Sequence, residues 1–447
     1  MEKAEENCGV FGIYSGKECA GKVHSALHFL QHRGQQYCGI ATSNGQEVMI
    51  RTRKGRVDAT FTREDFEALE GNFGIGHVSL RERQPTILRS KLGIFAVCFN
   101  GNITNAEELI KRLKDKGHSF WIDFQVELLA KIITQENSFV EGIEAVARQV
   151  EGSYSLLVLT PKGIYAARDC FGFKPLVLGR NDKEYAVASE SRALQNLDLE
   201  IERDVKPGEI VFIGKSGFKT EKMLGSKRTA FCAFEWAYTA SVDSVIEGLS
   251  VDRARNNMGA MLAKRDKGKL EADIVAPVPN SGIGHAEGYH LESGIPLKSV
   301  FLIDRYGDRS YTQATQEERD IEAKKKLSVL RDAVSGRRIV LCDDSIVRGT
   351  QIREKVKELK KAGAKEVHVR VACPPLMFPC RFDISTRSFD ELIARRMSEK
   401  EICGYIGADS LVYNSLEDFV KAIGKKREEL CLYCWDGKSP FKEKSES

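Results

Sequence analysis

A turn with two adjacent acids and a hydroxyl-rich loop is the strongest chemical signal in the sequence. The apolar run at residues 338–342 leads into Asp343 and Asp344, and the loop 345–350 precedes a helical stretch at 351–362. Backbone N–H groups and hydroxyls at the start of a helix can hold a phosphate, and the helix dipole assists. Two carboxylates can accept hydrogen bonds from ribose hydroxyls or hold Mg²⁺, which prefers oxygen ligands. The turn therefore predicts a sugar-phosphate site.

The surrounding patterns predict two kinds of layered architecture. Before residue 230, short apolar strands at 8–14, 92–99 and 154–159 are interleaved with helical periodicity at 106–114 and 126–134. This mixture predicts an α+β domain that ends near residue 230. Afterwards, apolar runs at 274–278, 338–342 and 366–371 alternate with charged helices. Such runs are typical of buried parallel strands, so the second half is expected to be a doubly wound α/β domain.

Composition narrows the class of partner. The chain has 447 residues, with 68 Lys and Arg against 64 Asp and Glu, and a net charge of +4. This balance does not favour nucleic acid or a membrane as the partner, which leaves small molecules. No apolar run approaches the roughly 18 to 20 residues of a membrane span, and the acidic start lacks the features of a signal peptide. A cytoplasmic location is expected, where the twelve cysteines are catalytic, metal-binding or buried rather than disulfide-bonded.

The acidic turn resembles the PRPP loop of type I phosphoribosyltransferases, PRPP being 5-phosphoribosyl 1-pyrophosphate. The resemblance implies that Mg²⁺ and cationic side chains stabilise the departing pyrophosphate. It places Mg²⁺ at Ser281, Asp343 and Asp344. The PRPP-binding residues that it implies are Asp343, Asp344, Ser345, Ile346, Val347, Arg348, Gly349, Thr350, Arg305, Arg309 and Lys326.

Six segments of the first half occur in an order that resembles another domain. They are residues 8–13, 30–35, 76–78, 100–105, 168–176 and 189–191. Together they are similar to the glutaminase domain of class II, N-terminal-nucleophile amidotransferases. With the PRPP loop, the chain from Cys8 to Pro440 resembles the glutamine phosphoribosylpyrophosphate amidotransferase family. The resemblance implies a propeptide at 1–7, an αββα glutaminase domain at 8–230, a type I phosphoribosyltransferase domain at 231–440 and a tail at 441–447.

In this family resemblance Cys8 is the nucleophile, although its position alone is typical of a buried structural cysteine. Cleavage between Asn7 and Cys8 would free an α-amine with a pKa of about 8, which can act as the base for the thiol. Asn100 and the Gly101 backbone N–H are expected to stabilise the oxyanion formed on the glutamine amide.

Two motif positions that bind glutamine in the family differ here. Ser79 stands where the family has an arginine that clamps the α-carboxylate. Arg81, two residues on and about 7 Å along a strand, is the expected replacement. For the glutamine amino group we expect Asp123, although alignment on Glu127 would place Gln125 there. These departures leave open an ammonia-dependent paralogue with an impaired glutaminase site.

Four cysteines match the ligands of the iron–sulfur form of the family. Cys431 and Cys434 form a C-x-x-C pair, a weak signal alone, and Cys232 and Cys380 complete the set. Four thiolates suit a [4Fe–4S] cluster or a tetrahedral zinc ion, and the expected role is structural and oxygen-sensing. The other cysteines are interpreted as small buried residues: Cys19, Cys38, Cys98, Cys170, Cys342, Cys373 and Cys403. His32 and His77 are interpreted as structural.

The activity implied by the resemblance is formation of 5-phosphoribosylamine, glutamate and pyrophosphate from PRPP, glutamine and water, at the first committed step of purine synthesis. Purine nucleotides are the expected inhibitors, and a homo-oligomer, tetramer or dimer, is the expected assembly. A different class of function also stays open, a non-catalytic protein that senses PRPP or nucleotides. Pyrophosphate release separates that alternative from the enzymes.

Overall fold

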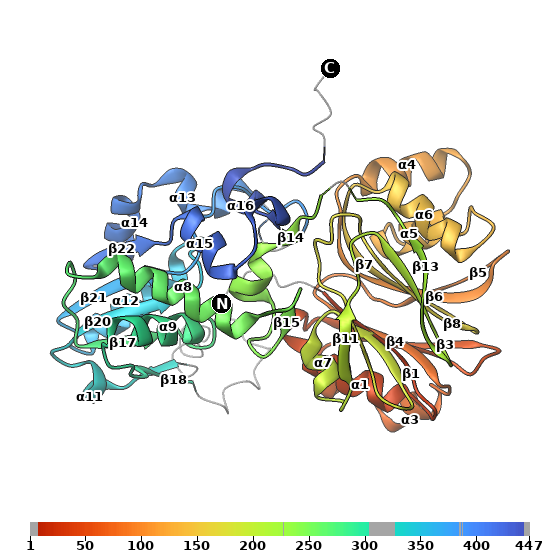
Figure 1. Ribbon diagram of the computed structural model, residues 1–447, viewed down its shortest axis with the longest axis horizontal. Coiled ribbons are helices and arrows are strands. Elements are labelled where there is room, and N and C mark those ends of the chain that lie inside the picture. The colour runs from red at the N-terminus through yellow and green to blue at the C-terminus, as the bar shows by residue number, and fades with distance from the viewer. Residues whose placement is uncertain (1–7, 227, 304–326, 384–385, 387, 442–447) are drawn as a thin grey trace, which may run out of the picture.

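The computed structural model describes residues 8–226, 228–303, 327–383, 386 and 388–441. The predicted propeptide at 1–7 and the predicted PRPP contacts Arg305, Arg309 and Lys326 lie outside the described residues. Figure 1 shows two lobes, one built from the first half of the chain and one from the second.

The first lobe contains two antiparallel sheets. One has seven strands in the order β11-β9-β10-β1-β4-β2-β3, and the other has six in the order β13-β12-β8-β7-β6-β5. The strands are β1 (Gly9–Tyr14), β2 (Tyr37–Ser43), β3 (Val48–Lys54), β4 (Phe73–Ser79), β5 (Thr86–Ser90), β6 (Gly93–Ile103), β7 (Gly152–Thr160), β8 (Gly163–Arg168), β9 (Val177–Arg180), β10 (Tyr185–Ala188), β11 (Glu200–Asp204), β12 (Glu209–Gly214) and β13 (Gly217–Met223). The helices are α1 (Ala20–Phe29), α2 (Val57–Thr60), α3 (Arg63–Glu67), α4 (Ala106–Asp115), α5 (Gln125–Ile133), α6 (Phe139–Gln149) and α7 (Ser191–Gln195), with the short η1 (Gln31–Arg33).

Three buried apolar clusters fix the order of the layers. Alternate residues of β1 and β4, such as Val10 and Ile75, pack against Cys98 and Leu157 of the second sheet. The outer face of the first sheet packs on α1 and α7. The outer face of the second packs on α4, α5 and α6. Because a strand alternates its side chains between two faces, both sheets are covered on both sides. The αββα expectation is confirmed.

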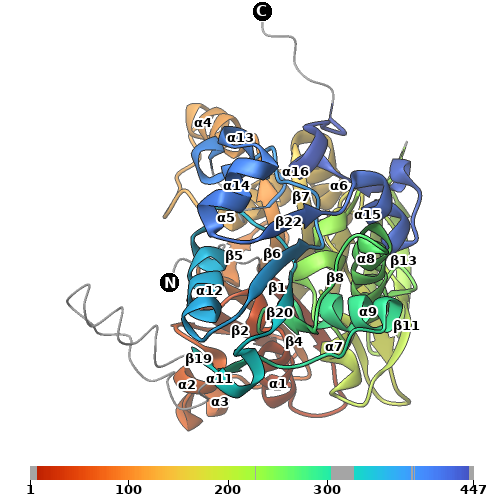
Figure 2. The ribbon, with the colours of Figure 1, turned by 90° about the vertical axis from the view of Figure 1, so that its left-hand side faces the viewer.

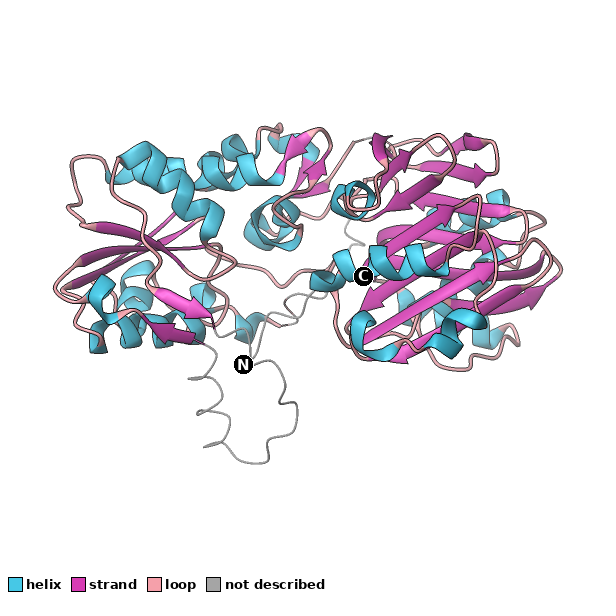
Figure 3. Ribbon diagram, turned by 90° about the horizontal axis from the view of Figure 1, so that it is seen from below, coloured by secondary structure: helices cyan, strands magenta, loops and turns pink. Residues whose placement is uncertain are grey.

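The second lobe is a parallel sheet with helices on both faces. Its strands β17, β20, β21 and β22 lie in that order. Residues of α8 and α9 pack on one face of the sheet, and residues of α12 and α14 pack on the other. Figure 2 shows α9 and α12 on opposite sides of β20. In Figure 3 strands dominate the first lobe, whereas helices flank the strands of the second. The type I phosphoribosyltransferase expectation is confirmed.

The second lobe's elements have the following bounds. The strands are β14 (Phe231–Cys232), β15 (Val245–Ile246), β16 (Leu249–Ser250), β17 (Ile274–Pro277), β18 (Phe301–Ile303), β19 (Leu327–Val329), β20 (Arg338–Asp343), β21 (Glu366–Val371), β22 (Ser410–Tyr413) and β23 (Leu430–Cys431). The helices are α8 (Val251–Asp266), α9 (Ile283–Ser293), α11 (Arg331–Val334), α12 (Thr350–Lys361), α13 (Ile393–Arg396), α14 (Glu399–Ile406), α15 (Leu416–Ile423) and α16 (Tyr433–Asp436), with the π-helix η2 (Glu235–Thr239) and the 3-10 turns η4 (Phe389–Glu391) and η5 (Arg427–Glu429).

Candidate functional site

Cys8 immediately precedes β1, the first strand of the chain. In the antiparallel pairing of β1 with β4, Gly9 is opposite Val78, so the next position along places Cys8 beside Ser79. Burial raises the pKa of the Cys8 thiol to about 12, and the nearby carboxylates of Glu82 and Asp383 add to that shift. The thiol is therefore neutral near pH 7, and it needs a base if it is to act as a nucleophile.

The predicted oxyanion residues lie on β6, which packs against the Cys8 sheet. Asn100 is 1% exposed, and neither its Nδ2 nor its Oδ1 has a hydrogen-bond partner among the described residues. Buried polar side-chain atoms are nearly always paired, so this amide is available for a ligand. Cys98, two residues earlier and so on the same face of β6, has its pKa raised by burial and, next, by Cys8. Asn100 therefore faces the inter-sheet region that contains Cys8.

Gly101 has a backbone conformation that a side chain would disrupt. Its φ is +153°, and a Cβ atom would lie 2.0 Å from the Ser153 carbonyl oxygen on β7. The close approach of β6 and β7 at this point thus requires glycine. Its neighbour Asn102 is fully bonded, donating to the Arg381 carbonyl at 2.8 Å and accepting from Gln125 Nε2 at 3.0 Å.

The two predicted glutamine contacts lie in different places. Arg81 follows the end of β4 at Ser79, so the expectation that strand alternation would orient it was wrong. Burial lowers the pKa of Arg81, and Cys8, followed by Glu82 and Asp383, opposes that shift, so the side chain does lie near Cys8. Asp123 is on the surface instead, where its carboxylate pairs with Lys114 at 2.8 Å.

Glu82, which the sequence analysis did not single out, lies near both Cys8 and the start of α5. Its carboxylate accepts hydrogen bonds from the Gln125 N–H at 3.0 Å, the Val126 N–H at 3.4 Å and Gln84 Nε2 at 3.3 Å. Burial raises the pKa of Glu82, and these N–H groups oppose the rise. Among the charged groups that act on the Cys8 thiol, Glu82 has the largest effect.

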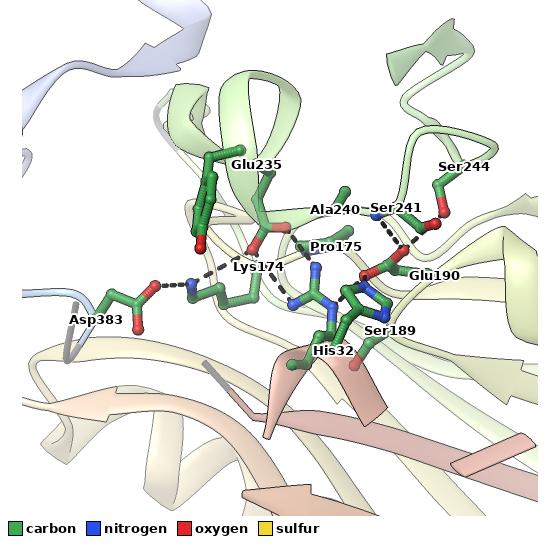
Figure 4. A network of polar contacts seen from close by, with 12 residues as sticks. His32, Lys174, Pro175, Ser189, Glu190, Glu235, Ala240, Ser241, Ser244 and Asp383 are labelled. Carbon is green, nitrogen blue, oxygen red and sulfur yellow. Dashed lines mark hydrogen bonds and ion pairs between the residues drawn. The ribbon is translucent and has the colours of Figure 1, made fainter. Parts of the chain in front are cut away.

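A buried network of charges links the Cys8 site to the second lobe. Arg33 pairs with Glu190 and with Glu235, and its Nη1 lies 3.5 Å from the Cys8 carbonyl oxygen. Lys174 pairs with Asp383 and lies 3.4 Å from Glu235 Oε1. Figure 4 shows Lys174 reaching between these two carboxylates. Burial alone would lower the pKa of Lys174, but Asp383 and Glu235 outweigh it and raise the pKa.

The predicted structural histidines take part in such contacts. His32 Nε2 lies 2.8 Å from Glu190, which also accepts from the Ser241 N–H at 2.8 Å and from the Ser244 hydroxyl at 2.7 Å. His77 lies 3.1 Å from the Phe99 carbonyl oxygen, and burial lowers its pKa to about 3. His32 thus joins η1 to the Glu190 that contacts the second lobe, and His77 joins β4 to β6.

The PRPP-loop residues lie at the carboxyl end of β20. Ile346 is buried in the core of the parallel sheet, and the Val347 carbonyl accepts the Ile393 N–H at 2.9 Å. These apolar side chains anchor the loop, which leaves its polar groups at the surface of the site. Gly349, with φ +79°, precedes the first residue of α12, Thr350, and Arg348 donates to Glu391 at 2.9 Å.

The predicted magnesium residues form one hydrogen-bonded group. The Ser281 hydroxyl donates to Asp343 at 2.8 Å, and the Ser345 hydroxyl donates to Asp344 at 2.6 Å. Burial, followed by the charge of Asp343, raises the pKa of Asp344. Asp343 thus disfavours the ionisation of Asp344, whereas hydrogen bonds with Asp344 lower the pKa of Asp343 against the larger effect of burial.

The four predicted cluster cysteines line one pocket, which also includes Phe173 and Trp435. Cys232 and Cys431 are adjacent in the β14–β23 parallel pair. A hydrogen bond with Cys380, followed by burial, raises the pKa of the Cys434 thiol well above its ordinary range. Even so, the described residues contain no group of three or more His, Cys, Asp or Glu side chains arranged to hold a metal ion.

The other seven cysteines are mostly as expected. Cys19, Cys38, Cys98, Cys342 and Cys373 are buried, whereas Cys170 and Cys403 are half-exposed. Cys170 follows the end of β8, and Cys403 lies on α14 with its thiol 3.3 Å from the Ala408 carbonyl oxygen. For these two the expected burial is corrected.

Comparison with known proteins adds to this geometry. A family model described as a glutamine amidotransferase domain matches residues 39–196, and one described as a phosphoribosyl transferase domain matches residues 251–398. The amidophosphoribosyltransferase of Methanocaldococcus jannaschii is 38% identical, over 97% of this chain and 97% of its own. The chain belongs to the amidophosphoribosyltransferase family.

Other relatives agree in length and fold. The amidophosphoribosyltransferase of Archaeoglobus fulgidus is 40% identical, over 97% of this chain and 98% of its own. The solved structure of Bacillus subtilis glutamine PRPP amidotransferase, complexed with ADP and GMP, is 35% identical, has a TM-score of 0.93 and covers 98% of this chain and 99% of that one. Membership in the amidophosphoribosyltransferase family thus rests on the whole length of the chain.

Two residues near the candidate sites of this family member were missed by sequence reasoning. Glu82 stands in a segment where the family motif is altered, and Lys174 lies inside the segment 168–176. A lysine in an otherwise apolar turn is a signal that could have been noticed for Lys174.

Every helix in the described part of the chain is too short or too polar to cross a membrane.

Proposed function

We propose that the chain makes 5-phosphoribosylamine, glutamate and pyrophosphate from PRPP, glutamine and water. The observation that carries this proposal is the unpartnered amide of the buried Asn100, next to Gly101 and on the β6 face that carries Cys98. A buried donor left without a partner suits a charge that develops only during reaction. The proposed units are a propeptide at 1–7, a glutaminase domain at 8–230, a phosphoribosyltransferase domain at 231–440 and a tail at 441–447.

In the glutaminase half, Cys8 is the proposed nucleophile. Removal of residues 1–7 would leave an α-amine on Cys8 that accepts the thiol proton, which is needed because burial raises the pKa of that thiol to about 12. The sulfur then bonds to the amide carbon, and Asn100 Nδ2 and the Gly101 N–H bind the oxyanion. Collapse releases ammonia and leaves a thioester, which water hydrolyses to glutamate. Arg81 is the proposed partner of the glutamine α-carboxylate.

In the phosphoribosyltransferase half, the loop from Ser345 to Thr350 is the proposed 5-phosphate site. Its anchors, Ile346 and Val347, are packed, so the backbone N–H groups are held in place before the phosphate arrives. Arg305, Arg309 and Lys326 are the proposed pyrophosphate contacts from the sequence. Ammonia then displaces pyrophosphate at C1 of the ribose.

Ser281, Asp343 and Asp344 are the proposed residues at Mg²⁺, and their donor set fits the ion. Mg²⁺ is usually held by one or two carboxylates together with water and substrate phosphates, so a complete cage of protein ligands is not required. When bound, it supplies positive charge that balances the pyrophosphate. Asp343 and Asp344 would also be held ionised by it.

A [4Fe–4S] cluster on Cys232, Cys380, Cys431 and Cys434 is the proposed cofactor of the second lobe. The four thiols line a common pocket, and thiolates are the ligands that such clusters use. A single zinc ion requires four sulfurs about 2.3 Å from one point. If bound, a [4Fe–4S] cluster would be held by these four thiolates and would supply a covalent link between the segments that carry them. The cluster would tie β14 to β23.

Purine nucleotides are the proposed inhibitors, supported by the ADP and GMP named in the Bacillus subtilis complex. A homo-oligomer, dimer or tetramer, is the proposed assembly.

The experiment that tests the proposed function is an assay of anaerobically purified protein with PRPP and Mg²⁺, supplied with glutamine or with ammonium chloride. Pyrophosphate release with glutamine, accompanied by an equal amount of glutamate, is expected. Release with ammonium alone would show that the glutaminase half is inactive. Absence of release with both donors would contradict the proposed function.

A further inference from the structure

The amino-acid end of glutamine needs two opposite charges close to Cys8. With its amide carbon at the sulfur, glutamine carries its α-carboxylate and α-ammonium a few bonds away, in a partly buried site. Charges removed from water are stable only when they are paired and hydrogen-bonded. The carboxylate that receives the ammonium must therefore lie beside Cys8. The motif aspartate Asp123 does not meet this requirement, because it is exposed and pairs with Lys114.

Glu82 is held next to Cys8 by the backbone. The Ser79 hydroxyl donates to the Glu82 carbonyl at 2.6 Å, and Ser79 follows Val78, the residue that pairs with Gly9 next to Cys8. Ser79 is itself fully buried, so the bend that leads to Glu82 starts from a fixed point.

The Glu82 carboxylate is fixed from a second direction. It accepts the Gln125 N–H at the first residue of α5, and the Gln125 side chain in turn contacts β6. There Gln125 Nε2 donates to Asn102 Oδ1 at 3.0 Å, and its Oε1 accepts the Ile103 N–H at 2.9 Å. Through Gln125, the position of the Glu82 carboxylate is thus fixed relative to β6, the strand that carries Asn100 and Gly101.

The other carboxylates near Cys8 are committed to cations of the protein. Asp383 pairs with Lys174, while Glu190 and Glu235 pair with Arg33. At Glu82 each of the three described hydrogen bonds comes from an uncharged N–H group, and the cation that acts on this carboxylate is its neighbour Arg81. A carboxylate has about four acceptor positions, so one more donor can be accommodated.

We propose that Glu82, and not the motif aspartate Asp123, receives the α-ammonium group of glutamine. The Glu82 carboxylate would thereby make the enzyme select, as nitrogen donor, an amide that carries an α-amino group. The inference rests on the proposed function and concerns the same site. Arg81, the next residue, would meet the α-carboxylate, so that neighbouring residues of one bend bind both charges.

The test compares wild type, Glu82→Gln and Asp123→Asn with three nitrogen donors: glutamine, glutaric acid monoamide, which is glutamine without its amino group, and ammonium chloride. In wild type, glutamine should be preferred to the monoamide. In E82Q the KM for glutamine should rise by about tenfold to a hundredfold, the usual range for losing a charged hydrogen bond. The preference for glutamine over the monoamide should fall with it.

Ammonium-dependent pyrophosphate release reports whether each variant is folded, because this activity does not use the glutamine site. It should stay within about twofold of wild type in E82Q, and D123N should match wild type with all three donors. Three results would overturn the inference. They are a raised glutamine KM in D123N but not in E82Q, an undiminished preference for glutamine in E82Q, and an equal loss with glutamine and ammonium, which would indicate only a structural cap. Wild type that releases no pyrophosphate with any donor would overturn the proposed function itself.

Discussion

Replacement of Asn100 by leucine should change stability and activity in opposite directions. Leucine has a similar size and removes two buried polar atoms, Nδ2 and Oδ1, that lack hydrogen-bond partners in the described part of the chain. Each such atom costs about 1 kcal/mol or more of the free energy of unfolding, so N100L should be more stable by about 2 kcal/mol. For a domain of about 220 residues this corresponds to a rise in Tm of about 4 to 8 °C.

The same change should remove one donor to the oxyanion. We expect kcat with glutamine to fall by about 10²- to 10³-fold, because a single oxyanion donor usually contributes that much. Ammonium-dependent pyrophosphate release should be unchanged. The assays are thermal unfolding by circular dichroism and initial rates of glutamate and pyrophosphate formation.

A matched control lies two residues along the same strand. Asn102 has the same side chain, but its Nδ2 and Oδ1 are both bonded, to the Arg381 carbonyl and to Gln125. Asn102→Leu should therefore lower the free energy of unfolding by about 1 to 3 kcal/mol, since it removes two hydrogen bonds that contribute about 0.5 to 1.5 kcal/mol each. If N100L were as destabilised as N102L, or kept its glutamine kcat, the assignment of Asn100 would be refuted.

Three further outcomes are expected. Ser281→Ala should raise the Mg²⁺ concentration for half-maximal pyrophosphate release several-fold, because Ser281 orients Asp343, while glutamate formation from glutamine should persist; an unchanged Mg²⁺ requirement would exclude Ser281 from the site. Cys431→Ala should lower iron and acid-labile sulfide per chain in anaerobic protein, and full iron content would rule out Cys431 as a ligand. The pKa of His77 is about 3 in the folded protein and about 6.5 in the unfolded chain. Its contribution to stability is therefore present above pH 6.5, and it falls by up to about 1.4 kcal/mol for each pH unit below that. Urea unfolding at pH 6.5 and pH 4.5 should show a smaller loss in His77→Gln than in wild type, and equal losses would contradict the shift.

The layers and the PRPP loop could be predicted from sequence because their signals are local. The apolar run of β20, the two acids and the following helix lie within about 25 consecutive residues, and periodicity places them without knowledge of the rest. The αββα order was obtained from the family resemblance, since alternation alone does not say which sheets face each other.

The positions of Arg81 and Asp123, the two expected glutamine contacts, could not be predicted because they depend on where elements end. The expectation for Arg81 assumed that the strand continues, but β4 ends at Ser79. Asp123 lies just before α5. The first N–H groups of that helix donate to Glu82, which is 43 and 44 residues away in the sequence, and a local pattern cannot indicate such distant contacts. The partners of Lys174 are 61 and 209 residues away, at Glu235 and Asp383, so no local pattern indicates its burial.

The central claim is that the two halves act together, so that nitrogen from the glutamine amide reaches the ribose. Anaerobic protein should be given PRPP, Mg²⁺ and glutamine labelled with ¹⁵N in its amide, in the presence of excess unlabelled ammonium, and the phosphoribosylamine trapped and analysed by mass spectrometry. We predict that most of the product carries ¹⁵N. A label diluted to the proportion of ammonia in solution would contradict the account, because the glutaminase site would then not supply the phosphoribosyltransferase site.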